Sequence, residues 1–379
     1  MGELSLPIYF MKVVFTSYNN QPGYSNPDQW IQNIRRMTEL MEALGKQCAV
    51  TYLKYTGCEA HLRLNGVEYI FLRSTKSKYR FPFRMNSTIK KMQADIVIVS
   101  GLRYPLQIMQ LRWALGKNVK IIARHHADKP PDGFRKILQR YADRSIDAYL
   151  FTSFGNASDW LVSGIIKDKQ KIFELLAASA NFSKMDKQEA RQKIGVTAGE
   201  IFLWVGRLNA NKDPLTVLKG FKGYLTLNPG AKFYMIYQGE DLLQQLKEFI
   251  DQSKSLSDAV ILKGYVAYDE LPVWYSAADL YISGSHSEGG SYALLEAMAC
   301  GCIPVVTAIP AALKVIGDGE YGISFKPGDA NDLANKLAGL CAIDQQTFSI
   351  KIEKYFKAEL SSGAIATKLY GYCKELLAK

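Results

Sequence analysis

The densest group of residues that could do chemistry lies in residues 283–310, SGSHSEGGSYALLEAMACGCIPVVTAIP. A strand is expected at the start of this segment, a loop of small residues follows, and a helix is expected to begin near Ser291 or Tyr292. The backbone N–H groups of Gly289–Ser291 can come close to an anion there, and the helix dipole also favours phosphate. This part of the sequence therefore predicts a phosphate site.

Two glutamates flank that loop. Glu288 precedes the glycines, and Glu296 lies eight positions further on, inside the expected helix. A carboxylate beside a phosphate would be repelled by it, whereas carboxylates accept hydrogen bonds from sugar or ribose hydroxyls. Two of them could hold the two ends of a nucleotide sugar. The alternative is that Glu296 is a surface helix residue and the glycines form a plain turn.

A second cluster, VGRLNANKDP, follows another expected strand at residues 205–214. Gly206 permits a close backbone approach, while Arg207 and Lys212 could clamp a diphosphate. The Asp213-Pro214 pair is typical of the cap and first position of a helix. An ordinary basic loop is the alternative interpretation.

The third cluster is the segment RHHAD at residues 124–128, again after an expected strand. Adjacent side chains in extended backbone point in different directions, so at most one of His125 and His126 is expected to face a ligand. No second His/Asp/Glu cluster has metal-ligand spacing, so no metal site is predicted.

Short apolar, β-branched runs alternate with helix-like stretches along the whole chain, which indicates an α/β fold with parallel sheets. The pattern occurs twice, and it predicts two doubly wound, Rossmann-like units whose ligands bind at the carboxyl ends of the strands. The expected strands are 12–16, 47–53, 96–100, 120–123 and 148–152 in the first half, and 201–205, 232–237, 260–263, 280–283, 303–307 and 322–325 in the second.

Domain boundaries follow from the same pattern. The expected domains are 1–183, 184–358, and a C-terminal helix over 359–379 that packs back on the first domain. The polar stretch 181–192 is the linker candidate, and 28–45 is expected to be one helix.

The composition is that of a globular protein, with 379 residues, of which 48% are hydrophobic and 22% charged. No apolar run approaches the length of a membrane span, and the N-terminus has an acidic residue where a signal peptide has basic ones, so we expect a soluble intracellular protein. The six cysteines are too scattered for a zinc site or a disulfide framework.

The net charge of +11 is concentrated. Residues 71–145 hold 17 basic and four acidic side chains. Such a segment suits an anionic partner, which could be a nucleic acid, a phosphorylated substrate or an acidic membrane surface. A solvated basic surface without a partner is the alternative.

Taken together, these motifs resemble one family. SEGGSYALLEAMACGCIPVV resembles the signature of the family 4 glycosyltransferases, in which two glutamates are separated by seven residues, as Glu288 and Glu296 are. VGRLNANKDP resembles the family's diphosphate motif at Arg207 and Lys212, and His126 aligns best with its first-domain histidine. The loop after the first strand departs from the family, because it has Gly23 alone where a Gly-Gly pair is common.

The resemblance implies a GT-B fold, with two facing domains and a cleft between them, and a retaining transferase that uses a nucleoside-diphosphate sugar. It implies that Arg207 and Lys212 neutralise the diphosphate and that Glu296 binds the ribose. It also places Glu288 near the reaction centre and His126 by the sugar or the acceptor hydroxyl.

Further roles follow from the same resemblance. Gly206 belongs to the donor site, and the amides of Gly290, Ser291 and Tyr292 contact phosphate or sugar. Neither a metal nor another cofactor is expected. The implied acceptor is a glycan or glycolipid, in polysaccharide or glycolipid assembly, and the implied location is the cytoplasm or the inner face of the membrane.

Two other functions stay open from the sequence. One is a nucleotide-sugar epimerase of the same architecture. The other is a nucleic-acid-binding protein that uses the basic segment together with aromatic residues such as Tyr79, Phe81, Phe83 and Tyr104. The glycosyltransferase interpretation expects no nucleic-acid partner.

Overall fold

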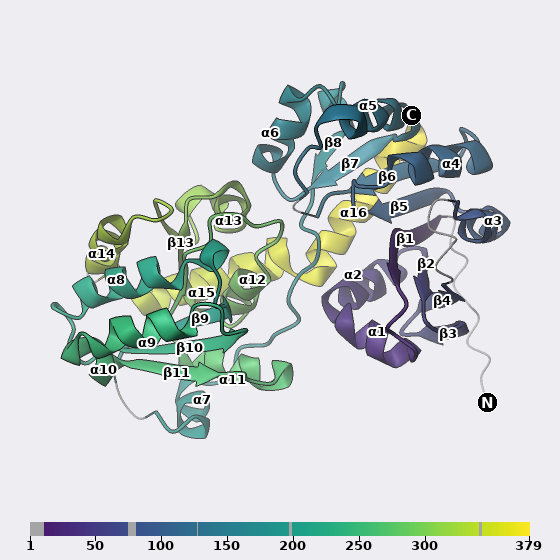
Figure 1. The fold of residues 1–379 in the computed structure, drawn as a ribbon. Helices are drawn as coiled ribbons and strands as arrows, with labels where there is room; N and C mark the ends of the chain where they lie inside the picture. Colours follow the sequence, from purple (N-terminus) through teal and green to yellow (C-terminus); the bar gives the residue numbers. More distant parts are fainter. Residues whose placement is uncertain (1–10, 75–80, 127, 197–198, 341–342) are drawn as a thin grey trace, which may run out of the picture. The chain divides into compact units, whose positions relative to one another are not determined.

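The computed structural model describes the chain except for residues 1–10, 75–80, 127, 197–198 and 341–342 (Figure 1). It consists of two compact units. Unit 1 comprises Met1–Ser179 and Ser362–Lys379, and unit 2 comprises Ala180–Ser361. The domain boundaries expected from the sequence lie after residues 183 and 358.

Unit 1 is built on a sheet of eight described strands in the order β3-β4-β2-β1-β5-β6-β7-β8 (Figure 1). All neighbours are parallel except β3 and β4, which form an antiparallel edge pair. The strands are β1 (Lys12–Gln21), β2 (Ala49–Thr56), β3 (Ala60–Leu64), β4 (Val67–Arg73), β5 (Ile96–Ser100), β6 (Lys120–Arg124), β7 (Ala148–Phe151) and β8 (Ile172–Glu174). Central strands such as β5, with the sequence IVIVS, are apolar on both faces because helices cover both.

The helices of unit 1 are α1 (Pro27–Asn33), α2 (Arg35–Gly45), α3 (Phe83–Met92), α4 (Pro105–Leu115), α5 (Gly133–Ala142), α6 (Phe154–Val162) and α16 (Ser362–Ala378). The C-terminal helix α16 packs against α2. The ring of its Tyr372 lies at a tilt against Phe173 of β8, with 4.8 Å between ring centroids, and its hydroxyl donates a hydrogen bond of 3.1 Å to the carbonyl oxygen of Glu174. The C-terminal segment is thus part of unit 1.

Unit 2 contains a sheet of six described strands in the order β11-β10-β9-β12-β13-β14, all parallel. The strands are β9 (Ile201–Arg207), β10 (Lys232–Gln238), β11 (Val260–Gly264), β12 (Leu280–Ser283), β13 (Ile303–Thr307) and β14 (Ile323–Phe325). The helices are α7 (Lys187–Lys193), α8 (Pro214–Tyr224), α9 (Leu243–Asp251), α10 (Lys254–Ala259), α11 (Leu271–Ala277), α12 (Tyr292–Ala299), α13 (Pro310–Val315), α14 (Ala330–Gly339) and α15 (Gln345–Tyr355).

The predicted doubly wound parallel sheets are confirmed, and every strand expected from the sequence is present. The prediction missed β3, β4 and β8. The first two form a hairpin through Asn65 and Gly66, which both have positive φ. In β3, His61 and Arg63 alternate with apolar residues, which is the period of an edge strand with one face toward solvent and not the apolar run of a buried strand.

Two predicted helices are interrupted. The expected helix over 28–45 is broken at Ile34 (φ −103°, ψ 21°) into α1 and α2. The expected tail helix over 359–379 is broken at Ser361 (φ −63°, ψ 156°), so that α16 begins at Ser362. In both cases an apolar period continues across a residue whose backbone leaves the helical region, which periodicity alone does not reveal.

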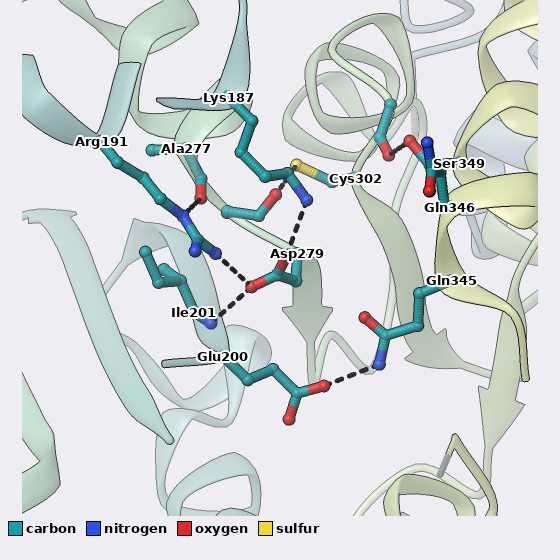
Figure 2. A network of polar contacts seen from close by, with 12 residues as sticks. Lys187, Arg191, Glu200, Ile201, Ala277, Asp279, Cys302, Gln345, Gln346 and Ser349 are labelled. Atoms are coloured by element: carbon teal, nitrogen blue, oxygen red, sulfur yellow. Dashed lines mark hydrogen bonds and ion pairs between the residues drawn. The ribbon is translucent and has the colours of Figure 1, made fainter. Parts of the chain in front are cut away.

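The prediction of a linker over 181–192 was partly wrong. Residues from 187 onward form α7, which is anchored to the sheet of unit 2 (Figure 2). Lys187 Nζ and Arg191 Nη2 each lie 2.7 Å from a carboxylate oxygen of Asp279. The same carboxylate accepts a 2.7 Å hydrogen bond from the backbone N–H of Ile201, at the start of β9. Polar composition indicated a linker, whereas these polar residues are structural.

Asp279 belongs to a device that the fold uses three times at the amino ends of its strands. Asp95, Asp147 and Asp279 each stand immediately before a strand. Their carboxylates accept hydrogen bonds of 2.7, 2.6 and 2.7 Å from the backbone N–H groups of Lys12, Ile121 and Ile201 in the neighbouring strand. Each aspartate thus satisfies a strand-end donor that the ladder leaves unpaired.

Candidate functional site

The loops that carry the predicted donor-site residues lie at the point where the strand order of unit 2 reverses. From β9 the sheet runs to β10 and β11 on one side and to β12, β13 and β14 on the other (Figure 1). The carboxyl ends of β9 and β12 are therefore the topological switch point, where open α/β sheets bind ligands. Arg207 ends β9, and the glycine loop follows β12.

The two loops are joined by an ion pair between Lys212 Nζ and Glu288 Oε1. The two side chains are 27% and 13% exposed, so the pair is partly shielded from water. The structure thus brings together a predicted diphosphate ligand and a predicted sugar contact. In this state each neutralises the other.

Hydrogen bonds reinforce the contact between the same loops. Asn211 Nδ2 donates to the carbonyl oxygen of Ser287 at 3.0 Å, and the backbone N–H of His286 donates to the carbonyl oxygen of Asn211 at 2.8 Å. His286 Nε2 lies 3.0 Å from Asp213 Oδ2. The position of the lysine relative to the glycine loop is therefore determined by several bonds.

Asp213 performs two tasks there. Its backbone is left-handed (φ 40°, ψ 58°), and its carboxylate accepts a 3.2 Å hydrogen bond from the N–H of Thr216, so it caps α8 with Pro214 as the first residue. The predicted cap is confirmed. Gly284 lies against this turn, because a Cβ at that position would come within 2.9 Å of the carbonyl oxygen of Asp213. Only glycine permits the two loops to approach so closely.

Arg207 is exposed at the end of β9, and the structure describes no ion pair for its guanidinium. Since no described acidic residue pairs with it, its charge is available at the switch point. Gly206, which precedes it, packs against the indole of Trp204, and an added Cβ would lie 3.1 Å from that ring. A side chain at position 206 would therefore displace Trp204 or the strand end.

Glu296 is not a surface helix residue. It is 1% exposed and accepts a 3.1 Å hydrogen bond from the hydroxyl of Tyr275 on α11. Burial raises the pKa of Tyr281 on β12, and the negative charges of Glu288 and Glu296 add to the rise. The charges of both carboxylates thus act on the same tyrosine.

The helix that follows the glycine loop begins at Tyr292, as predicted, with Ser291 at the cap. No side chain caps this helix, and Gly290, Ser291 and Tyr292 are all half-buried. A Cβ added at Gly290 would meet no atom of another residue within 4 Å, apart from its two chain neighbours. The backbone at this end of α12 is therefore accessible to a group in front of the loop.

The two adjacent histidines of unit 1 have different environments. His125 is buried, stacks on Phe151 with 4.7 Å between ring centroids, and its Nε2 lies 2.9 Å from the carbonyl oxygen of Asp128. His126 is exposed, and its Nε2 lies 3.2 Å from Nη2 of Arg124. Since a guanidinium can only donate, His126 Nε2 is the acceptor. His125 is thus a packing residue, and His126 is the one at the surface.

Desolvation lowers the pKa of the His126 imidazole, and the positive charges of Arg124 and Lys54 lower it further. Although the residue has solvent access, the hydrogen bond from Arg124 supports the same direction, because it requires an unprotonated nitrogen. His126 is therefore a neutral base at physiological pH.

Three residues of the site were missed by sequence reasoning. Tyr275, Tyr281 and His286 contact or face the predicted residues, but none of them was predicted as a site residue. For Tyr275 no local signal exists, because its hydroxyl meets Glu296 across 21 positions of sequence. His286 stands inside the glycine-loop segment, and its adjacency to Glu288 could have indicated a role.

Two features are absent from the described residues. These residues contain no group of three or more His, Cys, Asp or Glu side chains placed to hold a metal ion. None of their helices combines the length and the apolar character that crossing a membrane requires.

Solved structures with the same fold align over almost the whole chain. Sucrose-phosphate synthase from Thermosynechococcus elongatus aligns with a TM-score of 0.72 at 19% identity, over 97% of this chain and 99% of that one. The Anabaena protein HepE in complex with UDP aligns with a TM-score of 0.72 at 14% identity, over 96% and 100%. At these identities the likeness is one of fold, and the fold is that of the GT-B glycosyltransferases.

The sequence comparisons concern mainly the second half of the chain. Residues 186–351 match the family model described as "Glycosyl transferases group 1", so this segment is similar to that family. Mannosylfructose-phosphate synthase of Agrobacterium fabrum is 34% identical over 158 residues, which cover 40% of this chain and 34% of that protein. Alpha-monoglucosyldiacylglycerol synthase of Streptococcus pneumoniae is 25% identical over 282 residues, which cover 70% and 63%. The chain thus spans between a third and two thirds of the length of these two relatives.

Proposed function

We propose that this protein transfers a sugar from a nucleoside diphosphate to an acceptor hydroxyl, with retention of anomeric configuration. One observation carries the proposal. At the switch point of unit 2, two cationic side chains, two carboxylates and the amino end of α12 are gathered in a segment that matches the group 1 glycosyl transferases.

The Lys212–Glu288 ion pair supports a specific role in donor binding. A diphosphate carries more negative charge than one carboxylate, so it would take Lys212 from Glu288 when it binds beside Arg207. Glu288 would then accept hydrogen bonds from the sugar. Binding of the leaving group and positioning of the sugar would be coupled through one lysine.

The remaining contacts follow the same geometry. Glu296, held by Tyr275, would bind the ribose hydroxyls, and the amides of Gly290–Tyr292 would contact phosphate or sugar. His126, as a neutral base in unit 1, would act at the sugar or the attacking hydroxyl.

Catalysis would rest mainly on charge. In a front-face retaining reaction the diphosphate leaves while positive charge develops on the sugar, and preorganised cations stabilise the departing group. Arg207 and Lys212 would supply this stabilisation without a metal ion and without another cofactor.

The experiment is product analysis with the full chain. UDP-, GDP- and ADP-sugars are each incubated with and without candidate acceptors, and release of the nucleoside diphosphate is measured. Acceptor-dependent release, unchanged by EDTA, is expected, and proton NMR of the product should show the anomeric configuration of the donor. Release that is equal without an acceptor, or that never occurs although nucleotide binds, would contradict transfer.

We further propose that unit 1 docks on an acidic membrane surface from the cytoplasmic side, through α5. Its Phe134, Ile137 and Tyr141 are 72%, 50% and 54% exposed, and their spacing places them on one face of the helix. Arg135 and Arg140 are exposed beside them. An apolar stripe flanked by cations is the composition of a helix that lies in a lipid interface.

The surroundings of α5 extend this surface. Trp113, on the adjacent α4, is 84% exposed, and the guanidinium of Arg144 lies 5.3 Å from the ring of Tyr141. Lys76, Lys78 and Arg80 of the basic segment lie outside the described residues. A relative is named for a glycolipid, alpha-monoglucosyldiacylglycerol. These observations favour a glycolipid or membrane-borne glycan acceptor.

Sedimentation with vesicles tests the membrane proposal. The wild type should bind vesicles that contain phosphatidylglycerol much better than vesicles of phosphatidylcholine alone. Replacing Phe134 and Tyr141 by Ser should weaken binding about tenfold or more, since two apolar side chains would no longer insert. Leu227→Ser, at a site 61% exposed in unit 2, is the matched control. Equal partitioning into both vesicle types would refute docking on acidic lipid.

A further inference from the structure

Lys54 is an unusual residue of unit 1, because its side chain is buried without an anion. It lies on β2, is 2% exposed, and its ammonium is 5.3 Å from the centre of the Trp30 ring. Among the residues that the structure describes, its ammonium has neither a hydrogen-bond acceptor nor an ion-pair partner. Burial lowers the pKa of Lys54 to about 7. Burying an ammonium without an anion opposes folding, so such a group points to a missing ligand.

The position of Lys54 in the sheet is that of a ligand-binding residue. It lies two residues before the carboxyl end of β2, beside Ser17 of β1. The strand order of unit 1 reverses between β1 and β5, so β2 and β6 flank the switch point. Arg124 is the last residue of β6, and His126 follows it.

Lys54 and Arg124 act on one region. Nη2 of Arg124 lies 3.2 Å from Nε2 of His126, and the positive charges of both Arg124 and Lys54 lower the pKa of that imidazole. Arg124 is held in place because Nη1 donates to the carbonyl oxygen of Ala177 at 3.0 Å, while Nη2 reaches His126. The register places small, half-buried side chains between the strands, with Ser17 beside Lys54 and Ser100 beside Arg124.

Acidic residues nearby in sequence are engaged elsewhere. Asp128, which follows His126, forms an ion pair with Arg103, and Glu59, which follows β2, forms one with Arg84. Neither supplies a counter-ion for Lys54. Two basic side chains, Lys54 and Arg124, therefore lie near the carboxyl edge of the unit 1 sheet, beside a neutral imidazole.

We propose that Lys54, Arg124 and His126 form a binding site in unit 1 for a phosphate monoester carried by the acceptor. A dianion matches the two cations, and its oxygens can accept hydrogen bonds from the ammonium, the guanidinium and the Nδ1–H of the imidazole. Assigning the phosphate to the acceptor rests on the proposed function, whereas the existence of an anion site does not.

Calorimetric titration of the full chain tests the site, with inorganic phosphate and glucose 6-phosphate as probes and glucose as the neutral comparison. The background carries Arg207→Gln and Lys212→Met, which remove the cations of unit 2 that also attract phosphate. In this background both anions should bind and glucose should bind at least about tenfold more weakly. Lys54→Met should reduce anion affinity about tenfold to a hundredfold. Lys46→Met, an exposed lysine of the same unit, should not change it.

Further experiments distinguish the source of the phosphate and check that the variants fold. Vesicles that contain phosphatidic acid, offered to the variant with Phe134 and Tyr141 replaced by Ser, distinguish a lipid phosphate from a soluble one. Near-ultraviolet circular dichroism checks that Lys54→Met folds, and Lys54→Arg, which keeps the charge, should retain part of the affinity. Anion binding that is absent, or equal in the Lys54→Met and parent proteins, would overturn the inference. Thermal stabilisation by UDP, GDP and ADP in otherwise wild-type protein tests the donor site separately, so either proposal can fail alone.

Discussion

The carboxyl edges of the two sheets differ in how their charges are compensated. In unit 2 the cation Lys212 is paired with Glu288, and the buried carboxylate of Glu296 is held by Tyr275. In unit 1 the buried cation Lys54 faces a tryptophan ring, and its neighbour Arg124 bonds to a carbonyl oxygen and an imidazole. In unit 2 a lysine is thus paired with a carboxylate, whereas in unit 1 the two basic side chains lie beside a histidine.

This difference is informative because the opposite edges of the same sheets are alike. At the amino ends, Asp95, Asp147 and Asp279 cap the neighbouring strand in the same way in both units. The shared fold therefore repeats a structural device at one edge and leaves the other edge to differ. We expect function to reside at the edge that differs, because the strand ends there carry loops whose side chains are not needed for the sheet.

The largest effect on activity is expected from removing the cation Lys212, which is paired with Glu288 in unit 2. Lys212→Met removes a cation from the leaving diphosphate, and we expect kcat to fall about 10²- to 10³-fold, as for loss of one preorganised electrostatic contact. Steady-state kinetics with the best donor measures the change. Lys247→Met, at an exposed position of α9, is the control. An unchanged kcat would mean that the Lys212–Glu288 pair is only structural.

The second prediction tests the aspartate cap that occurs at the amino ends of strands in both units. Asp279→Ala leaves Arg191, Lys187 and the N–H of Ile201 without their acceptor (Figure 2). Unit 2 should lose about 3 kcal/mol of unfolding free energy. Chemical denaturation measures it, with Asp258→Ala, at an exposed position of α10, as the control. A loss no larger than that of the control would show that the strand-end cap contributes little.

The third prediction removes the uncompensated charge of unit 1. The unfolded chain keeps Lys54 protonated up to about pH 10, whereas the folded chain releases the proton above about pH 7. The unfolded state therefore binds more protons between these values, and wild-type stability falls as the pH decreases from 10 to 7 and then levels off. Lys54→Met should be more stable than wild type at pH 7, by on the order of 2 kcal/mol.

That gain should shrink as the pH rises toward 10, because the penalty on the folded wild type disappears there. Thermal or urea unfolding in phosphate-free buffers over this pH range measures the gain. Lys46→Met serves again as the exposed control. A gain that is constant with pH would come from packing and not from the buried charge.

The smallest effect is expected from removing the hydrogen bond that holds the Glu296 carboxylate. Tyr275→Phe deletes the hydroxyl that donates to its carboxylate and keeps the ring. Loss of one such hydrogen bond is worth about 1 kcal/mol, so the KM for the donor should rise several-fold with a smaller change in kcat. Tyr265→Phe, at a 68% exposed tyrosine, is the comparison. A fall in kcat alone would indicate that Glu296 acts in the reaction and not in donor binding.

Much of the architecture could be predicted from local sequence, and the predictions that failed did so for physical reasons. Buried parallel strands such as β5, β12 and β13 are continuous apolar runs, so their bounds were predicted to the residue. The edge strand β3 lacks such a run, and the breaks at Ile34 and Ser361 depend on backbone angles that apolar periodicity does not encode. The polar helix α7 looked like a linker because its anchor, Asp279, is more than eighty residues away.

By itself, the sequence determined the two doubly wound units and named Arg207, Lys212, Glu288, Glu296 and His126 as candidates, because chemical type, spacing and position after a strand are local properties. Only the tertiary structure decided that Lys212 meets Glu288, that Glu296 is buried against Tyr275, and that Lys54 lies buried near Arg124 and His126. The reason is that charge compensation depends on distances between residues far apart in the chain, and the fold alone sets those distances.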